Sequence, residues 1–187
     1  VIRDNIRDFH LDHIFDCGQA FRWEKQQDGS YTGVAGGHIA NVQFEPYEGE
    51  TSCGRLILSN VTEEEYKNFW HGYLDMDRDY GAIKERLGKD SVMATAIGYG
   101  EGIRLLQQEP GETLLSFIIS QNNHIPRIKK CIETLSGNFG EKAGTLDGRD
   151  YYSLPSPEKL ASLTEEDLAV CRLGYRAKYL IETAKKV

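Results

Sequence analysis

Long apolar runs, paired cysteines and a positive net charge are all missing from this 187-residue chain. No hydrophobic run approaches the roughly 20 residues that cross a bilayer, and no signal-peptide pattern opens the sequence. The four cysteines (Cys17, Cys53, Cys131 and Cys171) are scattered without a C-x-x-C pair. This spacing argues against a zinc site or an iron–sulfur cluster and fits reduced thiols in a prokaryotic cytoplasm or a nucleus. His13 lies four residues before Cys17, but two ligands make no metal site, so we expect packing there and no cofactor.

The net charge of −7 speaks against a nucleic-acid binder, so the distribution of the charge matters. Residues 1–119 carry 11 Lys and Arg against 20 Asp and Glu, a net −9, whereas residues 120–187 carry 11 against 9, a net +2. The basic surplus is therefore confined to the last third of the chain. Such asymmetry is a hint, weak by itself, of one side that faces a polyanion.

The first sixty residues have the alternating pattern of β-strands. We expect strands over residues 19–23, 31–35, 38–44 and 55–59, with Gly36-Gly37 as a hairpin turn between the second and the third. A helix should cover one face of this antiparallel sheet from Thr62, where Thr62 and Glu65 have the spacing of a capping box. Its aromatic stripe (Tyr66, Phe69, Trp70 and Tyr73) is interpreted as core rather than as a platform for stacking bases.

From Asp75 onward the pattern is helical throughout. We expect helices over residues 79–87, 91–97, 111–120, 125–139 and 175–186, and helix starts at Ser156-Pro157-Glu158 and at Thr164 with Asp167. The chain is thus α+β, with an N-terminal sheet-and-helix domain at residues 1–100 and the first part of a helical domain at residues 101–187. The last helix runs to the final residue without a glycine stop, which we interpret as an interruption within a longer domain.

A run of side-chain amides, Gln121-Asn122-Asn123, separates two of these helical patterns. Amides carry both donors and acceptors, so a surface turn built from them suits the mixed hydrogen-bonding edges of nucleobases. Taken alone, this run is better explained as a turn that only joins two helices.

Four segments together resemble the 8-oxoguanine DNA glycosylase family of the helix-hairpin-helix glycosylase superfamily. They are CGQAFRW (17–23), GIRLLQQEP (102–110), SFIISQNNHIPRI (116–128) and LGYRAKY (173–179). Each is weak by itself, but their order and separation across nearly the whole chain are specific. The resemblance implies a TATA-binding-protein-like sheet domain followed by a helical domain, which agrees with the pattern of strands and helices.

The resemblance implies a monomeric enzyme of base-excision DNA repair whose partner is duplex DNA with 8-oxoguanine opposite cytosine. Such an enzyme flips the oxidised base out of the stack into a pocket. The main-chain carbonyl of Gly18 matches the group that accepts a hydrogen bond from N7–H of the oxidised base. Normal guanine presents a lone pair there, and an unmatched buried polar group costs about 1–3 kcal/mol. Gly18 also has a purely conformational explanation, a turn before a strand.

The resemblance also implies contacts with the cytosine that loses its partner. Asn122 matches the residue that fills the gap left by the flipped base, and Arg127 and Arg176 match the arginines that donate to the acceptor edge of cytosine. Tyr175 matches the aromatic wedge that unstacks the step and bends the DNA. Asn123 belongs to the same DNA-binding turn. His124 stands where the family has a third asparagine, and we expect it to contact a phosphate or to stabilise the turn.

No catalytic residue of the family falls within these 187 residues. The resemblance places a lysine nucleophile, which forms a Schiff base at the sugar C1′, in a hairpin beyond the last helix, and an aspartate further on. No Leu-Pro-Gly-Val-Gly-like hairpin motif occurs in the chain, and Lys178, Lys185 and Lys186 lie on a plain helical pattern. We therefore expect the chain to be the N-terminal portion of a DNA N-glycosylase/AP lyase and to be inactive alone.

Two other functions remain open at the level of the sequence. The chain could be a non-catalytic module that bends DNA or senses lesions. It could also be an α+β domain for protein or small-molecule binding, in which the amide turn is structural.

Overall fold

The computed structural model describes residues 1–186, which divide into two compact units. Unit 1 comprises residues 1–19, 23–32 and 40–107, and unit 2 comprises residues 20–22, 33–39 and the chain from Gln108 onward. Within the described range, no helix is long and apolar enough to cross a membrane.

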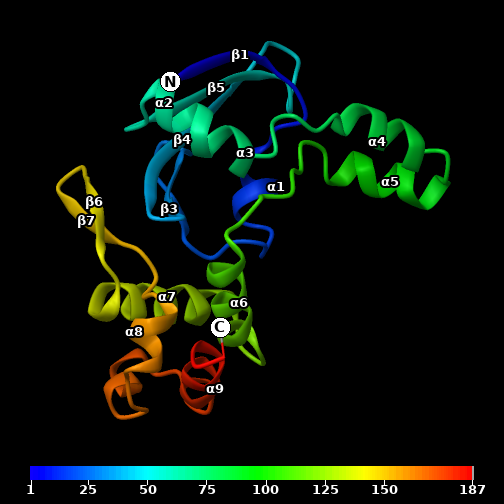
Figure 1. Ribbon diagram of the computed structural model, residues 1–187. Coiled ribbons are helices and arrows are strands. Elements are labelled where there is room, and N and C mark those ends of the chain that lie inside the picture. Colours follow the sequence, from blue (N-terminus) through cyan, green and yellow to red (C-terminus); the bar gives the residue numbers. More distant parts are fainter. Residues whose placement is uncertain (187) are drawn as a thin grey trace. The chain divides into compact units, whose positions relative to one another are not determined.

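A five-stranded sheet, most of which belongs to unit 1, has the strand order β1-β5-β4-β3-β2. Its strands are β1 (Ile2–Ile6), β2 (Trp23–Lys25), β3 (Tyr31–Ala35), β4 (His38–Pro46) and β5 (Gly54–Ser59). β5 pairs antiparallel with both β1 and β4, and Figure 1 shows β1 and β5 side by side at one edge. The antiparallel sheet expected from the alternation is confirmed.

The turn between β3 and β4 is the predicted one. Gly36 and Gly37 have φ angles of +53° and +79°, and positive φ at both central residues is what a tight type I′ hairpin requires. Glycine adopts this conformation without a steric penalty.

The strand expected over residues 19–23 is wrong, because strand structure begins only at Trp23. The alternation there comes from residues that pack in different units. Trp23 is buried in unit 1, whereas Phe21 packs against the core of unit 2. Two short elements at the start of the chain were not anticipated: β1 and the five-residue helix α1 (Leu11–Phe15).

The capping box at Thr62 is present. The Thr62 hydroxyl accepts the Glu65 N–H at 3.1 Å, and the Glu65 carboxylate accepts the Thr62 N–H at 2.8 Å. The helix that follows comprises α2 (Glu63–Glu65), a π-helical turn η1 (Tyr66–Trp70) and α3 (His71–Tyr73).

Three of the four residues of the aromatic stripe are core, as expected, whereas Phe69 is half-buried. Trp70 is fully buried, and Tyr66 and Tyr73 are 4% and 5% exposed. The Trp23 indole of strand β2 donates a hydrogen bond to the Tyr73 hydroxyl at 2.9 Å, so the helix is joined to the sheet by packing and by a buried polar contact. Unit 1 ends with two neighbouring helices, α4 (Tyr80–Leu87) and α5 (Ser91–Tyr99) (Figure 1).

The helices of unit 2 pack around one apolar cluster. They are α6 (Pro110–Ser120), α7 (Ile125–Phe139), α8 (Pro157–Ala161), the 3-10 helix η2 (Asp167–Cys171) and α9 (Arg176–Ala184). Ile119, Leu135, Leu160 and Leu180 are fully buried in the cluster. The bounds of α7 are those expected from the sequence, and Ser156 caps α8 with proline in its first turn.

The expectation that the chain is helical throughout after Asp75 is wrong. β6 (Lys142–Leu146) and β7 (Arg149–Tyr152) form an antiparallel hairpin. Asp147 and Gly148 both have positive φ, +50° and +76°, so this Asp-Gly pair makes the tight turn that it favours.

The residues after Thr164 also differ from the expectation. The capping contacts between Thr164 and Asp167 exist, but a 3-10 helix follows rather than an α-helix.

Candidate nucleic-acid interface

The amide turn joins α6 to α7 in unit 2. Helix α6 ends at Ser120, Gln121 is its C-cap, and Asn122 has a left-handed φ of +46°, which asparagine tolerates better than most residues. The Asn123 side chain donates to a carbonyl in the last turn of α6 at 3.1 Å and accepts the His124 N–H at 3.1 Å. Asn123 thus closes the turn, whereas within residues 1–186 the exposed side chain of Asn122 has no protein hydrogen-bond partner.

Arg176, the first residue of α9, holds the main chain of this turn. Its guanidinium is buried, at 4% exposure, and donates to the carbonyls of Gln121, Asn122 (2.8 Å) and Leu173 (3.1 Å). The guanidinium also lies 4.6 Å from the centre of the Tyr175 ring. A buried cation needs such a set of acceptors, so Arg176 fixes the shape of the turn.

The other expected DNA-binding side chains are exposed. Tyr175 is 52% exposed and contacts the Tyr179 ring edge-on, with 5.8 Å between centroids. The Arg127 guanidinium lies at the start of α7 and donates to the Arg172 carbonyl at 3.2 Å. His124 is the N-cap residue of α7, but its side chain makes no capping hydrogen bond.

Unit 2 therefore brings six of the seven expected site residues together around one turn and the starts of α7 and α9. They fall into two groups by exposure: Arg176 is buried and Asn123 half-buried, whereas Asn122, His124, Arg127 and Tyr175 are exposed. Among the exposed residues, Arg127 and Tyr175 each donate one hydrogen bond to a main-chain carbonyl, at 3.2 and 3.4 Å. An exposed amide and an exposed phenol on a rigid turn can enter a gap in a base stack, because they are held in place before the nucleic acid arrives.

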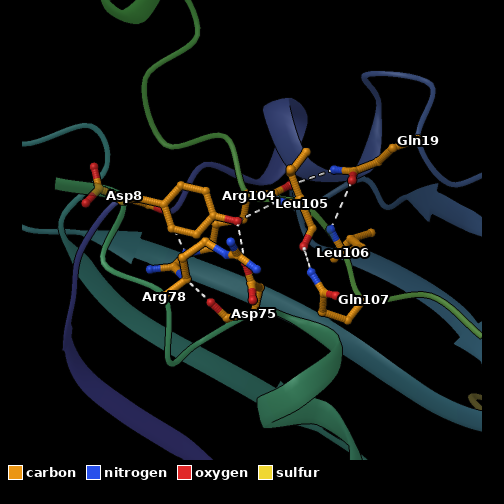
Figure 2. A network of polar contacts seen from close by, with 9 residues as sticks. Asp8, Gln19, Asp75, Arg78, Arg104, Leu105, Leu106 and Gln107 are labelled. Carbon is orange, nitrogen blue, oxygen red and sulfur yellow. Dashed lines mark hydrogen bonds and ion pairs between the residues drawn. The ribbon is translucent and has the colours of Figure 1, made fainter. Parts of the chain in front are cut away.

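The seventh expected residue, Gly18, lies in unit 1. Its φ is +88°, and a methyl group added at this position would meet no atom within 4 Å, so the conformation, not crowding, favours glycine here. The next residue, Gln19, fastens the loop. Its amide donates to the Ile14 carbonyl at 2.9 Å. It also donates to the Arg104 carbonyl at 2.8 Å and accepts the Leu106 N–H at 3.0 Å (Figure 2).

Arg104, whose carbonyl accepts a hydrogen bond from Gln19, is itself held in place by its side chain. Its buried guanidinium donates to the carbonyls of Arg7, Asp8 and Asp75 at 2.7–2.8 Å, and it lies 4.8 Å from the centre of the Tyr80 ring. Burial lowers the pKa of Arg104 from its usual value. The Tyr80 hydroxyl donates to the Asp75 carboxylate at 2.6 Å. Sequence reasoning assigned no role to Arg104, although it lies in one of the four family-like segments.

The histidine and cysteine noted in the sequence have ordinary protein partners. The His13 ring nitrogen Nδ1 lies 2.6 Å from the Glu101 carbonyl oxygen, and the Cys17 thiol is 3.7 Å from the Ile14 carbonyl. Among residues 1–186, no group of three or more histidine, cysteine or carboxylate side chains is placed to hold a metal ion.

Two family models match the chain end to end. "8-oxoguanine DNA glycosylase, N-terminal domain" matches residues 1–114, and "HhH-GPD superfamily base excision DNA repair protein" matches residues 115–187. The N-glycosylase/DNA lyase of Saccharomyces cerevisiae is 35% identical over 190 residues, which cover 98% of this chain and 50% of the yeast protein. The N-glycosylase/DNA lyase OGG1 of Arabidopsis thaliana is 29% identical over 181 residues, 90% of this chain and 46% of the relative. The chain thus spans about half the length of these curated relatives.

Solved structures agree in fold. The 8-oxoguanine glycosylase/lyase of Clostridium acetobutylicum, in complex with duplex DNA containing cytosine opposite 8-oxoguanine, is 45% identical with a TM-score of 0.91; the match covers 99% of this chain and 61% of that one. The 3-methyladenine DNA glycosylase of Archaeoglobus fulgidus, at 16% identity and a TM-score of 0.71 over 99% of this chain and 66% of that one, shares the fold alone. By the family models across its whole length and by these relatives, the chain belongs to the 8-oxoguanine DNA glycosylase family.

Proposed function

We propose that this chain is the lesion-recognition part of an 8-oxoguanine DNA glycosylase/AP lyase in base-excision repair. The observation that carries the proposal is the turn between α6 and α7, where Arg176 holds the main chain and Asn122 and Tyr175 stay exposed. Support also comes from the Clostridium acetobutylicum structure, whose DNA contains cytosine opposite 8-oxoguanine.

We assign the exposed residues of the turn to the cytosine opposite the lesion. Asn122 fills the gap in the stack, Tyr175 wedges beside it, and Arg127 donates to the acceptor edge of the cytosine. Arg176 can donate to cytosine only by exchanging one of its carbonyl partners, because its donors are already directed to the turn. Its contribution in the free protein is to hold the turn.

Gly18 is assigned to the flipped base. Its main-chain carbonyl accepts N7–H of 8-oxoguanine, and guanine, which lacks this hydrogen, leaves the carbonyl unpaired. The contacts of Gln19 restrict the main chain next to this carbonyl. Base excision and strand cleavage are assigned to a lysine and an aspartate in polypeptide beyond these 187 residues, as in the family.

We also propose that the protein acts as a monomer in a reducing compartment, a prokaryotic cytoplasm or a nucleus. The four cysteines, which are all free thiols, support this compartment.

The test of the proposed function is Asn122→Ala in the longer protein, with binding measured to a duplex that carries an abasic analogue opposite cytosine. Loss of the amide contacts should weaken binding about tenfold, the effect of a net hydrogen-bond loss of about 1.4 kcal/mol. Asn138→Ala is the matched control, because Asn138 is an exposed amide on α7 that bonds its own helix at 2.7 Å.

Equal binding by the Asn122→Ala variant and the wild type would remove the assigned role of the turn. Lesion binding without excision by the longest form of the protein would instead favour a lesion-sensing module.

A further inference from the structure

A hollow with cationic walls lies between α7 and η2 in unit 2. It has a volume of about 350 Å³, and we call it the basic groove. Seven residues line it: Arg127, Lys130, Cys131, Thr134, Val170, Cys171 and Arg172. The three cations are exposed, and none of the seven lining residues is a carboxylate.

One wall of the basic groove is a single face of α7. Arg127, Lys130 and Thr134 are spaced at i, i+3 and i+7, which places them on the same side of a helix. The opposite wall carries Arg172, the C-cap of η2, in a left-handed conformation with φ +52° and ψ +38°. The Arg127 guanidinium donates to the Arg172 carbonyl at 3.2 Å and so joins the two walls.

The floor of the basic groove adds no negative charge. Cys131 and Cys171 are buried there, at 3% and 2% exposure. Burial, and then the neighbouring Cys131, raise the pKa of the Cys171 thiol to about 11, so it is neutral at physiological pH. The charged side chains that line the groove are therefore its three cations.

The position of the basic groove in the chain indicates its partner. Arg127 lies in the first turn of α7, shortly after the amide turn, and Arg172 lies three residues before Tyr175. The groove thus adjoins both segments that carry the exposed DNA-binding residues. Residues 1–119, by contrast, have a net charge of −9. Positive charge that is clustered at one place binds a polyanion in a defined position. The same charge spread over the surface would attract it without orienting it.

We propose that the basic groove binds the phosphodiester backbone of the DNA, with Lys130 and Arg172 as the phosphate-contacting residues. This inference rests on the proposed function, since it adds a backbone contact to the recognition of the base pair. Phosphate contacts hold a protein in register on the duplex but carry no sequence information. The groove should therefore contribute to the strength of binding and not to the choice of base.

The experiment uses the longer protein that contains this chain and a duplex with an abasic analogue opposite cytosine. Binding constants are measured between 50 and 200 mM salt for the wild type and for a Lys130→Ala, Arg172→Gly double variant. Glycine is chosen at position 172 because it adopts positive φ without strain, so the variant keeps the local fold. Each lost phosphate contact should reduce the slope of log K against log salt by about 0.9, so the double variant should lose about 1–2 units of slope.

The matched control is the double variant Arg86→Ala, Lys89→Ala, which removes two exposed cations of the α4–α5 segment. It changes the net charge equally and should keep the wild-type slope. The preference for 8-oxoguanine over guanine should be unchanged in both double variants.

Two outcomes would overturn the role of the basic groove: a wild-type slope in the Lys130→Ala, Arg172→Gly variant, or an equal loss of slope in the control. Failure of the wild type to bind the duplex at any salt concentration would instead contradict the proposed function. A changed base preference with an unchanged slope would also contradict a backbone contact.

Discussion

At the scale of single residues, three polar side chains hold the main chain next to the residues proposed for recognition. Arg104 and Gln19 do so in unit 1, and Arg176 does so in unit 2. Main-chain carbonyls in irregular segments lack the regular hydrogen-bond partners of a helix or a sheet. Burying such a carbonyl without a donor destabilises the fold. A guanidinium with five donors satisfies several carbonyls at once, which explains why arginine occupies two of the three positions.

The contribution of Arg176 can be measured with Arg176→Lys. Lysine keeps the charge but cannot present the planar fork that reaches the carbonyls of Gln121, Asn122 and Leu173. We expect the free energy of unfolding to fall by about 2–4 kcal/mol, because charge-assisted bonds to buried carbonyls are lost. Denaturant titration of the variant checks this.

Lys178→Ala serves as the control for that measurement, because the Lys178 side chain is 60% exposed and pairs with the exposed Glu182 at 3.7 Å. Its effect should stay within about 0.5 kcal/mol. An Arg176→Lys protein as stable as the wild type would mean that the guanidinium contacts contribute little to the turn.

At the scale of elements, helix α1 depends on a cap whose strength changes with pH. The His10 ring nitrogen accepts the His13 N–H at 3.5 Å, and the two rings stack with 4.1 Å between centroids. Burial, and then the neighbouring His13, lower the pKa of His10. Only the neutral ring has an acceptor nitrogen for the cap.

Acidification should therefore destabilise unit 1 through His10. The pKa is lower in the folded state, so this contribution is present above the unfolded pKa of about 6.5 and is lost as the pH falls through the folded pKa. His10→Asn keeps a capping acceptor but does not titrate. The loss of melting temperature between pH 7 and pH 5 should be smaller in this variant than in the wild type, and His38→Asn is the control. Equal losses in His10→Asn and the wild type would exclude His10 as the cause.

Elements defined by local chemistry could be predicted from the sequence. The capping box at Thr62, the Gly36-Gly37 hairpin and the bounds of α7 each depend on residues within a few positions of one another. The β6–β7 hairpin carried a local signal as well, Asp147-Gly148, but its strands are short and lie among helical patterns. The failed strand at residues 19–23 has a different cause, because the alternating residues there pack in two different units.

The candidate site, too, could be predicted only where the information was local in the sequence. The residues of the amide turn were identifiable from their motif, and unit 2 places them around one turn. That Arg176 points inward while Tyr175 is exposed could not be predicted, because the direction of a long side chain depends on acceptors distant in sequence. Two of the three carbonyls that it binds belong to residues 54 and 55 positions away.

At the scale of the whole molecule, the surplus of positive charge lies in the same part of the chain as most of the residues proposed for recognition. The surplus of Lys and Arg falls in residues 120–187, which contain the amide turn, the basic groove and the start of α9. A net charge of −7 therefore does not exclude DNA binding here. Attraction confined to one region orients a polyanion, whereas a uniformly basic surface would bind it in many registers.

The last prediction concerns the chemistry available to the 187-residue chain alone. A lysine that attacks the sugar C1′ must be a neutral amine, which proteins obtain by desolvating it or placing it beside another cation. The lysines at the end of the chain do not meet this condition: Lys178 is 60% exposed and faces Glu182, and Lys185 and Lys186 are exposed. The purified chain should therefore release no base from an 8-oxoguanine:cytosine duplex and give no adduct with borohydride, whereas a longer protein with a buried lysine should do both. Robust excision by the chain alone would show that a nucleophile lies within these residues after all.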